Sequence, residues 1–219
     1  MIELERLFSL MAPSLAETLY MVFFSTLFSA IGGFLLGVLL VITEKGHIMP
    51  MPKLNQALGI IVNITRSLPF IILIIAIFPL SKFIVGTSIG STAAIVPLSI
   101  AAAPFAARVV ESSLKEVSWG IIEASMAFGA TRLQIITRVM LPEALPSLIL
   151  GLTITIINIL GYSAMAGAIG GGGIGDLAIR YGYQRFQTDV LIATILVLIV
   201  IVQAIQAGGN LLALKFDKR

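Results

Sequence analysis

The sequence has no cysteine, a single histidine and few charged residues. Without cysteine the chain can form neither disulfides nor thiolate metal sites, and His47 alone makes a zinc site implausible. Only 11% of the 219 residues are charged and 58% are hydrophobic, whereas soluble domains average about 25% charged residues. A larger hydrophobic core in a soluble protein would not explain so few charged residues. The composition therefore predicts an integral membrane protein with several spans.

The sequence also lacks the motifs of most enzymes. It contains no G-x-x-x-x-G-K-[ST], no nucleophile–base set and no paired carboxylates within its apolar runs. We therefore expect no catalysis, no cofactor of its own and no means of binding ATP phosphates. Gly170, Gly172 and Gly175 satisfy G-x-G-x-x-G, but they follow no strand, so we reject a dinucleotide site. The acidic N-terminus, MIELERLFSL, does not resemble a cleaved signal peptide.

Five apolar runs are long enough to cross a bilayer of about 30 Å. They predict transmembrane helices at approximately residues 15–42, 56–79, 90–110, 144–164 and 189–210. We assign residues 14–208 to one transmembrane domain. In the first run, Gly33 and Gly37 form a G-x-x-x-G motif, which permits close helix packing.

The second run contains Asn63 and Arg66, which are candidates for a pathway or an interface. Two interpretations stay open. Arg66 either lies inside the span and faces protein or water, because a charge is costly in lipid, or it marks the interface. In the second case the embedded part begins near Arg66, with Pro69 in its first turn.

The distribution of positive charge predicts the orientation, because cytoplasmic loops carry more lysine and arginine. One side holds nine such residues: Lys45, Lys53, Arg108, Lys115, Arg132, Arg138, Lys215, Lys218 and Arg219. The other side holds four: Arg6, Lys82, Arg180 and Arg185. We therefore expect the N-terminus outside, with the C-terminus and the loop 111–142 in the cytoplasm.

That loop contains an amphipathic segment, Glu123–Pro142, with the sequence EASMAFGATRLQIITRVMLP. Apolar residues recur through it at roughly helical spacing. Gly129 interrupts the pattern, where glycine costs about 1 kcal/mol against alanine, and we expect Pro142 to end it. A helix–glycine–helix of this kind suits either a surface element docked into a partner or an ordinary interfacial helix.

The end of the fourth run offers candidates for a substrate pathway: Asn158, Tyr162, Ser163 and Met165. These soft and amphipathic side chains could contact a substrate with a thioether or apolar tail. They could equally serve helix packing and an aromatic belt at the outer interface. They lie where the fourth run gives way to a glycine-rich segment, Gly161–Asp189, which we expect to be a loop with sharp turns or a cavity lining.

The amphipathic segment resembles the EAA loop of bacterial ABC-importer permeases. The family pattern is E-A-A, three residues, G, nine residues, then I-x-L-P. It matches Glu123, Ala124, Ser125, Gly129, Leu141 and Pro142, with serine for the second alanine and Val139 for isoleucine. Arg66-Ser67-Leu68-Pro69 resembles a short R-S-x-P stretch of amino-acid importer permeases. The resemblance implies a coupling helix at about Trp119–Thr131.

The glycine-rich segment GYSAMAGAIGGGGIGDLAIRYGYQRF resembles the methionine-uptake subfamily. The resemblance implies a bacterial inner-membrane permease for methionine, D or L, that forms a homodimer with the substrate route along its two-fold interface. It also implies two cytoplasmic ATPase subunits, which bind ATP and Mg, and an external substrate-binding lipoprotein. The alternatives are an importer of another small amino acid or dipeptide, a stand-alone secondary transporter, and a non-transport scaffold.

Overall fold

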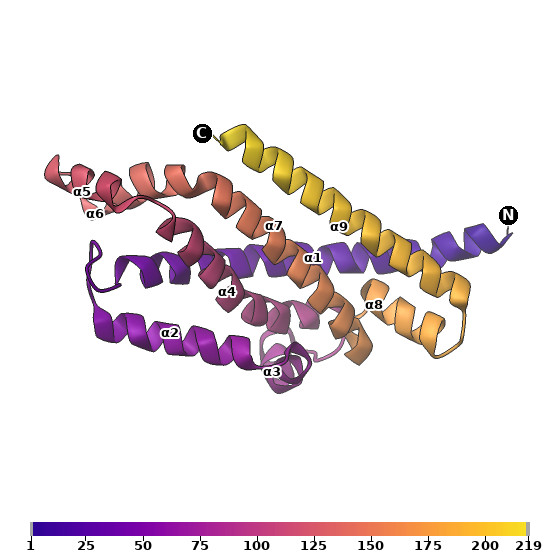
Figure 1. Cartoon of the computed structure of the whole chain (residues 1–219). Coiled ribbons are helices and arrows are strands. Elements are labelled where there is room, and N and C mark those ends of the chain that lie inside the picture. Colours follow the sequence, from indigo (N-terminus) through magenta and orange to yellow (C-terminus); the bar gives the residue numbers. More distant parts are fainter. Residues whose placement is uncertain (1, 218–219) are drawn as a thin grey trace. The chain divides into compact units, whose positions relative to one another are not determined.

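The computed structural model describes residues 2–217, and in that part the chain consists of helices and turns without strands (Figure 1). The elements are α1 (Ile2–Ile42), α2 (Pro52–Ser67), α3 (Phe70–Val85), α4 (Ser91–Lys115), α5 (Trp119–Ala127), α6 (Arg132–Gln134), the π-helix η1 (Ile135–Met140), α7 (Leu141–Ala166), the π-helix η2 (Gly167–Gly171), α8 (Gly173–Leu177), the π-helix η3 (Ala178–Tyr183) and α9 (Thr188–Phe216). The predicted all-α class is confirmed. Lys218 and Arg219, which entered the charge count, lie outside the described residues.

Within the described residues, four helical stretches are long and apolar enough to cross a membrane: Glu5–Ile42, Ser91–Lys115, Arg132–Gly171 and Thr188–Phe216. The second predicted span, 56–79, is divided into α2 and α3, which together would make a fifth, broken span. The helix is interrupted at Leu68 and Pro69 because a proline disfavours helical backbone in the residue before it. Pro69 is the N-cap of α3 rather than part of its first turn.

Two sequence-based expectations about helix ends are wrong. Pro142 does not end the amphipathic segment, because one helical stretch runs from Arg132 to Gly171. The wider π-helical turn lets the Leu141 amide donate to the Ile136 carbonyl, five residues back, and the helix continues through the proline. The segment expected to be a glycine-rich loop is mainly helical, since α7, η2, α8 and η3 occupy most of it.

The chain forms two compact units, each with its own core. The first contains Met1–Ser29, Leu68–Ala102 and Ile156–Ile205. Its buried residues form two apolar clusters, one around Met21, Ile74 and Leu98 and the other around Ile159 and Leu160.

The second unit contains Ala30–Ser67, Ala103–Thr155 and Gln206–Arg219. Here the second half of α1 packs closely against α4. A Cβ on Gly33 would lie 2.5 Å from the Ala106 Cβ, and one on Gly37 would lie 2.6 Å from the Ala107 carbonyl oxygen. The close packing predicted from G-x-x-x-G is therefore confirmed, with α4 as the partner helix.

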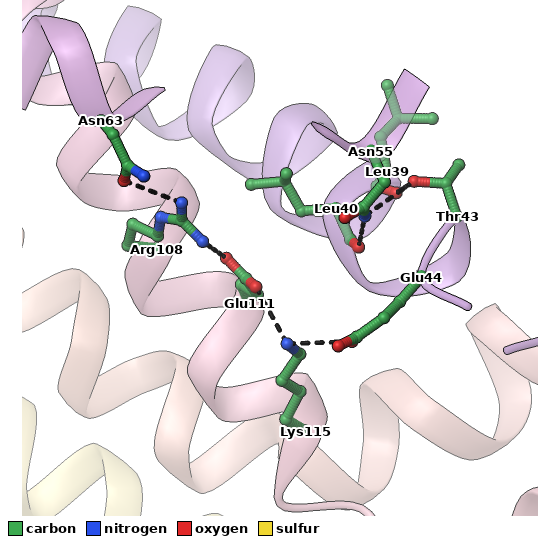
Figure 2. Close-up of polar contacts among 9 residues, drawn as sticks. All are labelled: Leu39, Leu40, Thr43, Glu44, Asn55, Asn63, Arg108, Glu111 and Lys115. Atoms are coloured by element: carbon green, nitrogen blue, oxygen red, sulfur yellow. Dashed lines mark hydrogen bonds and ion pairs between the residues drawn. The ribbon is translucent and has the colours of Figure 1, made fainter. Parts of the chain in front are cut away.

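Polar contacts hold α2 and the end of α1 to α4 in the second unit (Figure 2). Arg108 donates to Asn63 at 2.8 Å and pairs with Glu111 at 2.6 Å. Lys115 then pairs with Glu111 at 3.0 Å and with Glu44 at 2.9 Å. The Glu111 side chain is largely buried, and its charge is compensated by these two cationic neighbours.

We predict that Gly33→Ala destabilises the protein, because the added methyl group would overlap Ala106 and the α4 backbone. Overpacking of this kind costs about 1–3 kcal/mol. The neighbouring Gly32→Ala is a matched control, since its Cβ would make an ordinary 3.8 Å contact with Ala103. Thermal unfolding of the purified protein measures the difference. Equal melting temperatures for the two variants would contradict the close packing.

Candidate functional site

The predicted coupling segment forms a helical hairpin, which we define as α5, the turn Phe128–Thr131, α6 and η1 (Figure 1). Gly129 has φ of +80°, in the left-handed region where only glycine is unstrained. The Ala130 amide donates to the Ser125 carbonyl, and the Gly129 amide donates to the Met126 carbonyl. These two bonds form a Schellman motif, which satisfies carbonyls at the end of α5. The break expected at Gly129 is confirmed. The motif also links Gly129 to Ser125, because the Ser125 carbonyl accepts from the residue that follows the glycine.

The second helix of the hairpin begins with a capping box that our sequence analysis missed. The Thr131 hydroxyl accepts from the Gln134 amide, and the Gln134 side-chain oxygen accepts from the Thr131 amide at 2.8 Å. The sequence signal was present, because Thr131 and Gln134 have the T-x-x-Q spacing. The hairpin is therefore fixed on both sides of its turn.

One face of the hairpin is anchored in the core of the second unit. Ile122 of α5 and Ile135 of η1 are buried. They belong to one apolar cluster with Val41, at the end of α1, and Leu114, near the end of α4. Burying a side chain of this size contributes about 1.5–3 kcal/mol. The hairpin is thus attached to the ends of α1, α4 and α7 in this unit.

The opposite face of the hairpin is apolar and exposed. Phe128 is 93% exposed, and the other large exposed apolar side chains are Trp119, Ile121, Met126 and Leu133. Exposed apolar patches of this kind mark interaction sites. The periodicity of apolar residues did not identify Phe128 as exposed, because the exposure of a side chain depends on how the helices pack.

The predicted coupling residues divide between this exposed face and the core. Glu123, Ala124 and Gly129 are exposed on the hairpin, whereas the half-buried Ser125 uses its hydroxyl to donate to the Ile121 carbonyl. Two others lie at the start of α7. Pro142 is exposed there, and Leu141 packs against the buried cluster. The structure therefore brings the first three together as candidate contacts and places Leu141 as an anchor.

The turn 43–51 also contacts the hairpin. The His47 ring meets the Trp119 ring edge to face, with centroids 5.4 Å apart. Burial lowers the pKa of His47 from its ordinary value of 6.5, while Glu44 acts to raise it and Lys115 to lower it. Within the described residues the buried Nδ1 atom has no hydrogen-bond partner. The turn is thus adapted to a neutral histidine.

The candidate pathway residues lie at the end of α7, in the first unit. Met165 is 49% exposed, and Asn158, seven residues earlier on the same helical face, is half-buried. Tyr162 stacks on Phe70 with centroids 4.3 Å apart. Ser163 is only 2% exposed and donates to the Leu160 carbonyl. Met165, Asn158 and Tyr162 therefore remain available candidates, whereas Ser163 faces the core.

The two further candidates in α2 have different environments. Asn63 accepts a hydrogen bond from Arg108, so its side chain serves packing of α2 on α4 (Figure 2). Arg66 is exposed, and among the described residues its guanidinium has no ion-pair or hydrogen-bond partner. The structure leaves Arg66 available for a pathway or an interface.

The structure describes no metal or dinucleotide site. Among residues 2–217, no three histidine, aspartate or glutamate side chains lie close enough to hold a metal ion. Gly170, Gly172 and Gly175 lie in η2, at the α8 N-cap and in α8, after a helix rather than a strand. Within the described residues, these glycines therefore lack the strand–turn–helix setting of a dinucleotide-binding motif.

Apolar spans together with an exposed amphipathic hairpin define a multi-span membrane protein. The chain belongs to the family of binding-protein-dependent transport system inner membrane components, whose model matches residues 33–219. The family predicted from the EAA-like loop is thus confirmed, as is localisation in the inner membrane.

Several relatives are closely similar. The "Probable D-methionine transport system permease protein MetI" of Vibrio cholerae is 51% identical over 203 residues, covering 93% of this chain and 90% of that protein. The "D-methionine transport system permease protein MetI" of Escherichia coli K12 is 54% identical over 151 residues, covering 69% and 70%. A solved structure titled "Inward facing conformations of the MetNI methionine ABC transporter" superposes with a TM-score of 0.96 at 45% identity, covering 98% of this chain and 99% of that one.

We predict that the wild type loses more stability than His47→Phe when the pH falls from about 7.5 to about 5.5. At about pH 7.5 His47 is mainly neutral in both the folded and the unfolded chain. Below that value the unfolded chain binds the proton first, because the folded-state pKa is lower, so stability falls. His47→Phe keeps a ring against Trp119 and removes the titration. Thermal unfolding measures both; equal losses would contradict the burial of neutral His47.

Proposed function

We propose that the chain is the membrane-spanning permease of an ATP-driven importer of methionine. The observation that carries the proposal is the exposed apolar face of the hairpin, centred on Phe128. A face of this kind needs a separate protein to cover it, and the chain has no phosphate-binding motif of its own. The named relatives supply the substrate, methionine, without a distinction between D and L for this chain.

The assembly has two copies of this chain, two cytoplasmic ATPase subunits that bind ATP and Mg, and an external substrate-binding lipoprotein. The N-terminus lies outside, and the C-terminus and the hairpin lie in the cytoplasm, in line with the positive-inside bias. Five spans, the second one broken, are too few to enclose a route. A symmetric homodimer with the same surface on both protomers supplies the other wall.

The hairpin transmits movement because its two faces have different partners. The exposed face, with Glu123, Ala124 and Gly129, docks on the ATPase. The buried face, with Ile122 and Ile135, moves with the ends of α1, α4 and α7. Closure of the ATPase pair on ATP therefore tilts the spans, and hydrolysis resets them. This is alternating access by rigid movement around a substrate route.

The substrate route runs along the dimer interface past the end of α7. Met165 and Asn158 present a thioether and an amide on one helical face, and Tyr162 lies beside them on the same helix. A flexible, polarizable methionine side chain packs well against another thioether. Arg66 is available as a further contact in the route or at the dimer interface.

We predict that Gly129→Asp abolishes methionine uptake while membrane insertion stays intact. A side chain in the left-handed region costs about 1–2 kcal/mol, and a carboxylate at the end of α5 faces the negative end of the helix dipole. Gly86→Asp is a matched control, because Gly86 has φ of +85° at the end of α3. Uptake into cells measures the effect. Normal uptake by Gly129→Asp would contradict a coupling role.

We predict that Met165→Ala and Tyr162→Ala change the preference among amino acids. Loss of the sulfur–aromatic contact that Tyr162 makes with methionine, worth about 0.3–1.5 kcal/mol, should raise the methionine concentration for half-maximal uptake up to about tenfold in Tyr162→Ala. Ile154→Ala is the control, since Ile154 is equally exposed on the same helix three turns earlier. Competition by other amino acids measures preference. Unchanged affinities across the set would show that these residues only pack.

A further inference from the structure

Two neighbouring side chains of α1 bind the backbone at the start of α8. The Glu17 carboxylate accepts from the Gly173 amide at 2.7 Å, and the Thr18 hydroxyl accepts from the Ile174 amide at 2.8 Å. These amides open α8, so they have no acceptor within their own helix. The residues joined are 156 positions apart in the sequence.

The Thr18 hydroxyl both donates and accepts a hydrogen bond within the protein, and it is shielded from water. Its hydroxyl donates to the Ser14 carbonyl at 3.0 Å, which leaves an oxygen lone pair for the Ile174 amide. Thr18 is 2% exposed and Ile174 is completely buried. If Thr18 lost its oxygen, the buried amide would therefore have no replacement acceptor.

Glycines make this contact possible. Gly172 and Gly173 both have φ of +78°. A Cβ on Gly172 would lie 2.5 Å from Glu17 Oε2, and one on Gly173 would lie 2.6 Å from Thr18 Oγ1. The backbone can adopt this conformation, and approach both acceptors, only without side chains at these positions.

The same turn is fixed at two other points in the first unit. The Gly90 amide, just before α4, donates to the Gly170 carbonyl at 2.9 Å. Gly175 of α8 packs directly on the backbone of the last turns of α7, since its Cβ would lie 2.5 Å from the Ala164 Cα. Ala164 lies between Tyr162 and Met165. A shift of α8 would therefore displace the candidate pathway residues.

We propose that Glu17 and Thr18 are positioning residues for transport. They form an α1–α8 clamp, defined by the Glu17–Gly173 and Thr18–Ile174 bonds, that fixes the last turns of α7 where substrate passes. This proposal rests on the proposed function, because only a methionine importer would give the clamp a role in substrate binding. Neither residue is in the candidate coupling hairpin.

The test is methionine uptake by proteoliposomes that contain the assembled importer with its ATPase and binding protein, normalised to the amount of complex. Glu17→Ala and Thr18→Val should raise the half-maximal concentration about tenfold, the factor expected for a lost charge-assisted or buried hydrogen bond. Glu17→Gln and Thr18→Ser keep an acceptor and should restore wild-type values. Glu5→Ala, which removes a carboxylate from the same helix, should have no effect.

Hydrogen exchange of the 167–177 peptide in the purified complex tests the clamp independently of transport. Glu17→Ala and Thr18→Val should speed exchange there, whereas Glu5→Ala should not. Unchanged exchange in both variants would overturn the clamp, whatever the transport result. Failure of the wild-type complex to transport methionine would instead refute the proposed function. Faster exchange with an unchanged half-maximal concentration would reduce the clamp to a structural contact and overturn its positioning role.

Discussion

The structure depends on a helical hairpin that is apolar on both faces, with only one face covered by its own chain. Ile122 and Ile135 are buried against the ends of α1 and α4, while Phe128 is almost completely exposed. The buried face attaches the hairpin to the spans. In the proposed importer, the ATPase covers the exposed face, and its movement reaches the spans through the buried face.

Polar contacts around the largely buried Glu111 connect the elements beside the hairpin. Arg108, Glu111, Lys115 and Glu44 alternate in charge, and Glu111 would be an uncompensated buried charge without its neighbours (Figure 2). The Asn55 amide adds hydrogen bonds to the Leu40 carbonyl and the Thr43 hydroxyl. Within the second unit, the ends of α1, α2 and α4 are therefore held together beside the hairpin. In the first unit, the α1–α8 clamp plays the corresponding part for α7.

Those features of the fold and the candidate site whose cause lies within a few neighbouring residues were predictable from the sequence. Apolar runs indicated the spans, Gly33 and Gly37 indicated a close helix contact, and Gly129 indicated a break. The π-helical turn that carries the chain through Pro142 was missed because proline ordinarily ends helices. The clamp was not predictable, since Glu17 and Gly173 lie far apart in sequence and nothing local to Glu17 marks its partner. Exposure of Phe128 likewise depends on which hairpin face the core covers.

The most direct test of the central claim uses the absence of native cysteine. A Phe128→Cys permease, purified with its ATPase, is treated with a short thiol-reactive crosslinker. Phe186→Cys serves as the control, because Phe186 is another strongly exposed phenylalanine, placed on the outer side by the proposed orientation. We expect a crosslink to the ATPase from position 128 and none from position 186. No crosslink from position 128, or labelling of that cysteine from outside the cell, would contradict the coupling role of the hairpin.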